Sequence, residues 1–327
     1  MRSIVFEQFG QPDGVLQLQQ SHQPVPGPGE VVVRVHARPV NPSDLIPVRG
    51  SYRHRTPLPG VPGYEGVGIV TAAARGVHTP AIGIRVLALR GAGTWQEYVR
   101  APAACCVPVP VNLPDRLACQ LYINPLTAWV ILTEALHLVP GDVLLVNAGG
   151  SAFAHVLIQF ARILGYRVIL VTRNSLHTAR LKALGAYAVL DASVCAVYPA
   201  VMYWTHSRGA AAALDAVGGE AGADLAGCVA PGGSFVHYGL LSGRALALSD
   251  TQIKNAGLQV RGFWLRSWLQ RTSIERYQAV FDKILTLVST GRVTLLEPAC
   301  VYDLENVREA VRMAQRPGLA GKVVLTG

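Results

Sequence analysis

Charged residues are scarce in this chain: Asp, Glu, Lys and Arg make up only 15% of its 327 residues, whereas half are hydrophobic. A disordered chain needs low hydrophobicity and high net charge, so this composition excludes one. The 33 Gly and 21 Pro follow no period, which excludes collagen-like repeats. The longest charge-free stretch, residues 143–161, is broken by the turn sequence Asn-Ala-Gly-Gly-Ser. Such a turn would leave backbone groups unpaired in lipid, so we expect a soluble protein.

Cysteines are also few, and the six present show no C-x-x-C spacing. This excludes a disulfide scaffold and the common zinc clusters. The first ten residues lack the basic start, apolar core and cleavage site of a signal peptide. We therefore expect a cytoplasmic protein whose six cysteines are reduced and buried.

Lysine is nearly absent, so the net charge of +9 comes mainly from arginine. No run of basic residues is present, and the sequence does not indicate a nucleic-acid-binding protein. Two interpretations of the positive charge stay open. Arginine is either spread thinly without a function, or it attracts an anionic ligand or carrier.

The first 110 residues have the pattern of short strands separated by turns rich in Pro and Gly. Strands are predicted over residues 1–10, 30–36, 66–72 and 82–89. This spacing indicates a β module that resembles a partly open barrel.

From about residue 117, apolar strands alternate with helical stretches. The six predicted strands cover residues 142–147, 167–172, 186–190, 211–215, 233–238 and 258–263. Strands followed by helices at this spacing indicate a doubly wound parallel sheet of the α/β class, with the strand count of a dinucleotide-binding domain. A helix is predicted over residues 273–289, and a closing strand at residues 322–326 is expected to return to the first module. We expect the β module at residues 1–118, the α/β module at residues 119–264 and the return at residues 265–327.

A glycine-rich turn follows the first strand of the second module, before a helix predicted at residues 155–164. Such a turn lets the backbone approach a pyrophosphate, whose charge the helix N-terminus favours. Aligned on G-x-G-x-x-G, it reads Gly149-x-Ser151-x-x-Ala154, which has one glycine of three. By itself, this motif is equally compatible with an ordinary turn between a strand and a helix.

The end of the next strand carries no acidic residue. NAD sites place an Asp or Glu there to bind the ribose 2′-hydroxyl, whereas this chain has Arg173 followed by Asn174 and Ser175. An arginine here can bind the 2′-phosphate of NADPH through charge-assisted hydrogen bonds. The alternative interpretation is a surface arginine at the end of a strand.

Five segments together resemble the zinc-independent medium-chain dehydrogenases/reductases, and among them the 2-enoyl thioester reductases. They are Asn41-Pro-Ser-Asp through Gly50-Ser51-Tyr52, Pro62-Gly-Tyr-Glu-Gly66, Asn124-Pro-Leu-Thr-Ala128, Asn147 to Ala154, and Gly262-Phe-Trp-Leu265. Zinc-dependent members of the superfamily bind catalytic zinc with a Cys and a His, but the corresponding positions here are Ser43 and Tyr64. The chain departs from the subgroup at Ala154, where glycine is usual, and at Tyr64, where asparagine is usual.

The resemblance implies a GroES-like catalytic domain, a Rossmann nucleotide-binding domain and NADPH as the cofactor. The residues that it assigns to NADPH are Asn124, Gly150, Ser151, Ala152, Phe153, Arg173, Asn174, Ser175, Tyr238, Gly239, Leu240, Leu241, Phe263, Trp264, Leu265 and Lys322. It places Asn41, Tyr64 and Trp264 in the substrate pocket, implies no metal, and matches Tyr52 to the tyrosine implicated in catalysis. Without the resemblance, Tyr52 is better interpreted as a turn residue that packs on the β module.

These features together predict an NADPH-dependent reductase of an activated C=C bond, with a small or carrier-bound 2-enoyl thioester as the expected substrate. A phenol near the thioester can stabilise the enolate that hydride addition creates, or relay a proton. Two alternatives stay open: a quinone or small enone (acrylate) reductase, and a non-catalytic NADPH-binding protein. The resemblance also implies a homodimer formed by the edges of the nucleotide-binding sheets.

Overall fold

The computed structural model describes residues 1–91 and 93–327, and the chain divides into two compact units. Unit 1 comprises Met1–Leu126 and Ser273–Gly327, and unit 2 comprises Thr127–Thr272. Both boundaries lie later in the chain than the expected positions, residues 118 and 264. Residues just after 118 contribute to unit 1, where the ring of Tyr122 stacks on Phe281 at a centroid distance of 6.0 Å.

Unit 2 is built on a six-stranded sheet in which all neighbouring strands are parallel. Its strands are β8 (Val143–Val146), β9 (Arg167–Thr172), β10 (Ala188–Asp191), β11 (Ala210–Asp215), β12 (Val229–His237) and β13 (Gln259–Gly262). Their order is β10-β9-β8-β11-β12-β13, which reverses direction between β8 and β11. This order confirms the predicted doubly wound sheet, and the reversal is where such sheets bind ligands.

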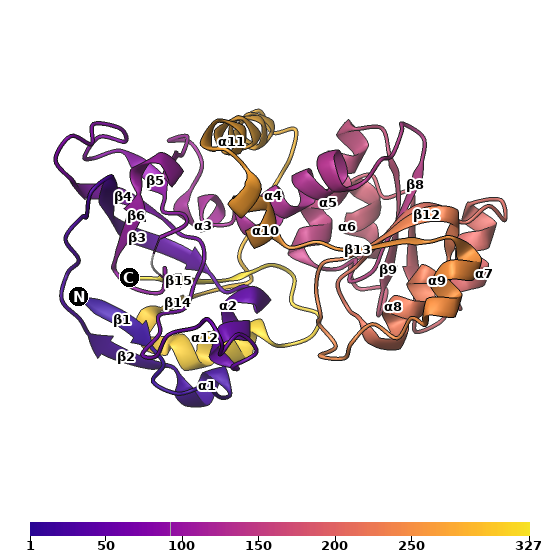
Figure 1. Cartoon of the computed structure of the whole chain (residues 1–327), viewed down its shortest axis with the longest axis horizontal. Helices are drawn as coiled ribbons and strands as arrows, with labels where there is room; N and C mark the ends of the chain where they lie inside the picture. Colours follow the sequence, from indigo (N-terminus) through magenta and orange to yellow (C-terminus); the bar gives the residue numbers. More distant parts are fainter. Residues whose placement is uncertain (92) are drawn as a thin grey trace. The chain divides into compact units, whose positions relative to one another are not determined.

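Helices cover this sheet on both faces (Figure 1). They are α5 (Ala152–Ile163), α6 (Thr178–Ala183), α7 (Val197–Trp204), α8 (Gly219–Ala226) and α9 (Asp250–Ala256). Unit 2 also contains α10 (Leu265–Arg271), which follows β13. Helices on both faces bury the strands of a parallel sheet on both sides, so the strands are rich in apolar residues. Leu145, Ile169 and Phe235, for example, are inaccessible to solvent. Helix α5 begins at Ala152, three residues before the predicted start, because Ser151 caps it.

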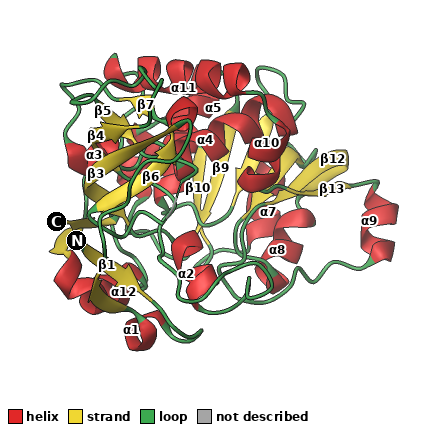
Figure 2. Cartoon of the chain, turned by 60° about the vertical axis from the view of Figure 1, so that its left-hand side comes forward, coloured by secondary structure: helices red, strands yellow, loops and turns green. Residues whose placement is uncertain are grey.

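Unit 1 contains a mostly antiparallel sheet of seven strands and a separate pair of strands (Figure 2). The sheet consists of β3 (Glu30–Pro39), β4 (Val67–Ala73), β5 (Arg85–Leu87), β6 (Tyr98–Pro102), β7 (Val107–Pro108), β14 (Cys300–Asp303) and β15 (Val323–Thr326). The pair consists of β1 (Arg2–Val5) and β2 (Gln17–Gln20). Strand β15 pairs with β3 in antiparallel orientation and with β14 in parallel orientation, so the last strand of the chain lies beside the first strand of this sheet.

The helices of unit 1 are short except one. They are α1 (Pro12–Val15), α2 (Pro42–Val48), α3 (Asp115–Ala118), α11 (Ile274–Ser289) and α12 (Val307–Ala314), whereas α4 (Ile123–Val130) begins in unit 1 and ends in unit 2. Helix α11 matches its prediction because Ser273 caps its N-terminus and Tyr277, Phe281 and Ile284 bury one face. In the described part of the chain, no helix combines the length and apolarity that crossing a membrane requires.

Three sequence predictions need correction. The strand predicted over residues 82–89 is only Arg85–Leu87, because Gly83 adopts a positive φ of 89° and Ile82 is 65% exposed. The strand predicted over residues 1–10 covers only Arg2–Val5. Four cysteines are buried as expected, but Cys195 and Cys300 are only partly buried.

Candidate functional site

The turn after β8 packs closely against the neighbouring strand and helix of unit 2. A Cβ atom on Gly149 would lie 2.9 Å from Cβ of Leu170, and one on Gly150 would lie 2.6 Å from Cδ2 of His177. Both distances are shorter than ordinary Cβ contacts, so a side chain at either position would force its neighbour to shift. Ala148 has a positive φ of 49°, which is uncommon for a residue with a side chain and marks a turn under local constraint.

The turn leads directly into α5. Oγ of Ser151 accepts a hydrogen bond of 3.1 Å from the backbone N–H of Ala154, which is a standard N-cap. The N–H groups of the first helical turn otherwise have no partner within the helix, and the helix dipole makes this end attractive to anions. The predicted contact residues 150–153 therefore lie where a pyrophosphate would fit.

The two loops that were predicted to contact the cofactor lie together at the carboxyl ends of β12 and β13. Tyr238 follows β12, and its ring packs against Phe153 of α5 at a centroid distance of 4.5 Å. The backbone N–H of Phe263 donates to the carbonyl of His237 at 2.8 Å, which joins the second loop to the first. Gly239 lies close to the backbone of Ala216, since an added Cβ would be 3.0 Å from that carbonyl oxygen.

Several predicted contact residues in these loops have side chains open to solvent. Leu240 is 48% exposed, Leu241 is 55% exposed and Trp264 is 55% exposed. Leu265 begins α10 directly after Trp264. Exposed large apolar side chains next to a glycine-rich turn are typical of a surface that a ligand covers.

The end of β9 is also exposed. Arg173, Asn174 and Ser175 all face solvent directly after this strand, and Oδ1 of Asn174 accepts a hydrogen bond from the N–H of Leu176 at 3.2 Å. Since β9 neighbours β8, Arg173 lies beside the glycine-rich turn at the same edge of the sheet. This is the position from which an arginine can meet a phosphate on the adenosine half of a dinucleotide.

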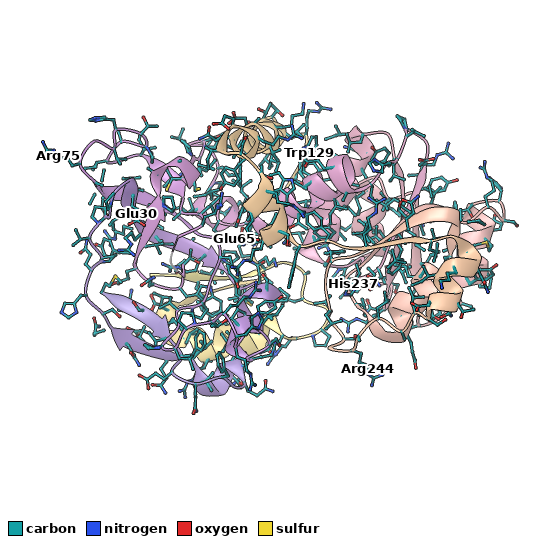
Figure 3. All side chains as sticks on the ribbon, in the orientation of Figure 1. Glu30, Glu65, Arg75, Trp129, His237 and Arg244 are labelled. Carbon is teal, nitrogen blue, oxygen red and sulfur yellow. The ribbon has the colours of Figure 1, made fainter. Side chains whose placement is uncertain are left out.

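Unit 1 holds a separate polar network centred on Glu65 (Figure 3), whose side chain is buried. Its Oε1 accepts a hydrogen bond of 2.7 Å from Nδ2 of Asn41. Oδ1 of Asn41 in turn accepts one of 2.5 Å from Nζ of Lys322. Two predicted site residues that are far apart in the sequence therefore bond directly to each other, and Asn41 also bonds a carboxylate that the sequence analysis did not single out.

The other oxygen of Glu65 holds the start of α4. Its Oε2 accepts hydrogen bonds from the backbone N–H groups of Tyr122 at 3.0 Å and Ile123 at 2.9 Å. A carboxylate at a helix N-terminus is stabilised by the helix dipole as well as by these bonds. Asn124, a predicted cofactor contact, is the next residue of this helix, so Glu65 fixes the backbone directly before it.

Burial perturbs the ionisation of this network. Desolvation raises the pKa of Glu65, and the bonds from Ile123 and Asn41 oppose that rise. Desolvation lowers the pKa of Lys322, while the nearby carboxylates of Glu65 and Asp44 act in the opposite direction. The network therefore contains ionisable groups whose charges depend on one another, as is typical of functional sites.

Asp44 connects the network to Tyr64. Its Oδ2 accepts a hydrogen bond of 2.7 Å from the N–H of Asn41, and its Oδ1 accepts one of 3.2 Å from the N–H of Tyr64. Burial raises the pKa of Asp44 to about 7. The Tyr64 side chain is 43% exposed, so this predicted pocket residue joins the network through its backbone.

Tyr52 lies on a different part of unit 1, in the turns after α2. Cζ of Arg55 sits 3.9 Å from the centroid of the Tyr52 ring, a cation–π distance. The backbone carbonyl of Tyr52 accepts a hydrogen bond of 2.9 Å from Oγ1 of Thr56. The tyrosine ring is thus held by its own loop and is partly open to solvent.

Glu65 and Asp44 are the site residues that sequence reasoning missed. One local signal was available for Asp44, because Asn41 and Asp44 have the spacing of a residue that caps a helix and its partner three positions later. No local signal identified Glu65 as the centre, since its side-chain partners come from two distant segments, at residue 41 and at residues 122–123.

The residues at this centre do not fit a zinc ion. Ser43 and Tyr64 stand where the zinc-dependent proteins have Cys and His, and neither side chain supplies a thiolate or an imidazole. In residues 1–91 and 93–327, no group of three or more His, Cys, Asp and Glu side chains is arranged to hold a metal ion.

Comparison with known proteins gives matches along the chain. Residues 27–111 match the family model described as alcohol dehydrogenase GroES-like domain, and residues 153–286 match the one described as zinc-binding dehydrogenase. The chain is 31% identical over 332 aligned residues to the mitochondrial enoyl-[acyl-carrier-protein] reductase of Mus musculus, with 100% of the chain and 88% of that protein covered.

Solved structures are similar over the full chain. A Bacillus thuringiensis protein whose name assigns it NADPH:quinone reductase activity is 44% identical with a TM-score of 0.96, covering 100% of this chain and 98% of that one. A mycobacterial protein solved in complex with NADPH is 27% identical with a TM-score of 0.92, and 100% of each chain is covered.

Proposed function

The chain belongs to the medium-chain dehydrogenase/reductase superfamily, and from this premise we propose that it is an NADPH-dependent reductase of an activated C=C bond, acting on a 2-enoyl thioester. The observation that carries this proposal is the composition of the polar centre in unit 1. Asn41, Glu65 and Lys322 form a network of hydrogen bonds, whereas a zinc-dependent alcohol dehydrogenase would hold a metal ion there. The similarity to enoyl-[acyl-carrier-protein] reductases favours the thioester as the substrate.

The residues of unit 2 fit a dinucleotide phosphate. The glycine-rich turn and the capped start of α5 offer backbone N–H groups to the pyrophosphate. Arg173 offers a guanidinium to the 2′-phosphate from the end of β9, where an NAD site would place an acidic residue. The exposed side chains of Leu240, Leu241 and Trp264 would cover the nicotinamide half. When bound, NADPH supplies a hydride to the β-carbon of the substrate.

A residue of unit 1 would then stabilise the negative charge that hydride addition creates, or relay the proton. Addition at the β-carbon leaves negative charge on the thioester oxygen, and the α-carbon must take up a proton. We assign Tyr52 to this role, because its phenol can donate a hydrogen bond to the oxygen or relay the proton. Arg55 stacked on the ring restricts its motion and places a positive charge nearby.

The second candidate is a quinone or small enone reductase. It is favoured by the 44% identity to the Bacillus thuringiensis protein, which exceeds the identity to the mouse enoyl reductase. A quinone can take its protons from water after hydride transfer, so this reaction needs no phenol.

One experiment separates these functions. NADPH oxidation is followed with crotonyl-CoA, a quinone and a free enone in parallel, at matched concentrations of purified protein. We expect the highest kcat/KM with crotonyl-CoA. A preference for the quinone or the enone would establish the second candidate instead, and NADPH binding without turnover on any of the three would indicate a non-catalytic protein.

We also propose a homodimer that forms along β13. This strand lies at the edge of the described sheet of unit 2, and three of its four residues are exposed. An exposed edge strand can pair with its copy across a two-fold axis. Light scattering at micromolar concentration should report twice the mass of the chain, and a monomer would contradict the proposal.

A further inference from the structure

A second buried polar network lies in unit 2, where β8, β11 and β12 end side by side. Asp215 is the last residue of β11 and is inaccessible to solvent. Its Oδ1 accepts a hydrogen bond of 2.5 Å from Nδ2 of Asn147, which directly follows β8. Oδ1 of Asn147 accepts one of 2.8 Å from the N–H of Ala216. These bonds lock the two strands together at the point where the strand order reverses.

His237, the last residue of β12 (Figure 3), completes this network. Its Nδ1 lies 2.7 Å from Oδ2 of Asp215. The same carboxylate accepts hydrogen bonds from the N–H groups of Val217 at 2.9 Å and Gly218 at 3.1 Å. An ionised carboxylate accepts and never donates, so this arrangement places the imidazole hydrogen on Nδ1.

The other ring nitrogen of His237 is left for a ligand. In the part of the chain that the structure describes, Nδ1 makes the one hydrogen bond of this ring, and Nε2 is not among the buried polar atoms without a partner. The His237 side chain is 28% exposed. In the neutral imidazole with its hydrogen on Nδ1, Nε2 carries a lone pair that can accept a hydrogen bond from a hydroxyl group.

The order of the strands decides which part of a dinucleotide would meet this nitrogen. Arg173 at the end of β9 would mark the adenosine phosphate, and the turn after β8 would mark the pyrophosphate. The next strands in the same direction across the sheet are β11 and β12. The nicotinamide half of the cofactor therefore falls on the side of His237.

We propose that His237 binds the nicotinamide-side ribose of NADPH by accepting a hydrogen bond from a ribose hydroxyl at Nε2, and that Asp215 is the positioning residue that fixes the ring. This inference rests on the proposed NADPH dependence. The proposal gives His237 a specific role, because this ribose carries the nicotinamide ring, whose placement decides the direction of hydride transfer. The bond between Asp215 and the imidazole fixes the orientation of the His237 ring before the cofactor binds, which reduces the entropy cost of binding.

The variant His237→Asn tests the proposal. The amide nitrogen of Asn lies near the position of Nδ1 and preserves the bond to Asp215, whereas nothing replaces Nε2. Calorimetry should show NADPH affinity reduced roughly two- to tenfold, which is the effect expected for one lost hydrogen bond. Affinity for 2′,5′-ADP, which carries only the adenosine half, should be unchanged. His237→Gln is the matched control, because its longer side chain reaches the position of Nε2 and should recover part of the NADPH affinity.

The positioning role of Asp215 has a spectroscopic readout. In the ¹⁵N spectrum of the wild-type histidines, the His237 signals are assigned by their loss in His237→Gln. They should show the Nδ1–H tautomer, and Asp215→Asn should abolish that preference. Addition of NADPH should shift the Nε2 resonance, whereas addition of 2′,5′-ADP should not.

The possible results separate the two proposals. If wild-type protein binds NADPH but His237→Asn binds it equally well, His237 has only a structural role and this inference is wrong while the proposed function stands. Equal weakening for NADPH and 2′,5′-ADP would also overturn it, because the defect would not be local. If the Asn variant fails to fold, the wild-type Nε2 shift decides the question. Wild-type protein that does not bind NADPH at all would refute both proposals.

Discussion

Replacing Glu65 with glutamine should destabilise unit 1 and weaken the site that it organises. The carboxylate accepts three hydrogen bonds, one from the Asn41 side chain and two from the N–H groups at the start of α4. Glutamine has nearly the same shape, but one of its two terminal atoms is an NH2 group. Whichever way the amide is oriented, a donor of the protein then faces a donor of the glutamine.

The size of the effect follows from these contacts. With the amide oxygen turned to the two backbone N–H groups, the bond from Nδ2 of Asn41 is lost. Rotating the Asn41 amide to compensate would turn its NH2 group toward the ammonium of Lys322. A hydrogen bond to a charged group contributes roughly 1.5–3 kcal/mol, and an unpaired buried donor costs a similar amount. The neutral amide avoids the desolvation that raises the pKa of Glu65, so we expect a net loss of about 1–3 kcal/mol.

Urea unfolding followed by circular dichroism measures this loss as a lower midpoint at an unchanged m value. The matched control is Glu297→Gln, which removes an exposed ion pair with Arg116 and should leave the midpoint nearly unchanged because solvent screens that pair. NADPH affinity should fall in the Glu65 variant as well, because Lys322 and the start of α4 lose their common support. Equal midpoints for the two variants would refute the account of Glu65 as the centre of the network.

Four further outcomes are expected. Tyr52→Phe should lower kcat by roughly ten- to ten-thousand-fold, depending on how well water replaces the phenol, and fluorescence titration should find NADPH affinity unchanged. Full turnover would return Tyr52 to a packing role. Arg173→Ala should reduce the preference for NADPH over NADH by roughly ten- to a hundredfold in calorimetry, whereas a wild-type protein that binds both equally would contradict the assignment. Burial raises the pKa of Asp44 in the folded chain to about 7 from its ordinary value of 3.8, so the unfolded chain loses this proton at a lower pH than the folded chain does. The folded state should therefore lose stability as the pH rises from about 4 to 7, and Asp44→Asn should flatten this decline in melting temperature. Wild-type and variant melting temperatures that decline in parallel would contradict this account. Chelators should leave activity intact, because the proposed reaction needs no zinc. Elemental analysis that finds one zinc ion per chain, whose removal abolishes activity, would overturn the proposed zinc independence.

The sequence by itself determined the elements and the anion-binding end of unit 2. Apolar runs bounded by Gly and Pro identified all six strands of the parallel sheet, because strand formation and turn chemistry depend on neighbouring residues. The turn after β8 was predicted from Gly149, Gly150 and Ser151, because turn formation also depends on neighbouring residues. The limits of elements were less determined: Ile82 has the side chain of a strand residue, but the positive φ of Gly83 removes it from the sheet.

Only the tertiary structure decided what lies at the two polar centres. Lys322 and Asn41 are 281 positions apart, and Asn147 and Asp215 are 68 apart, so no local pattern relates them. They meet because β15 pairs with β3 in one unit and β8 pairs with β11 in the other. Burial then determines the chemistry: Glu65 and Asp215 are ordinary acidic residues in the sequence, and they become the centres of their networks because folding removes water and leaves protein donors as their partners.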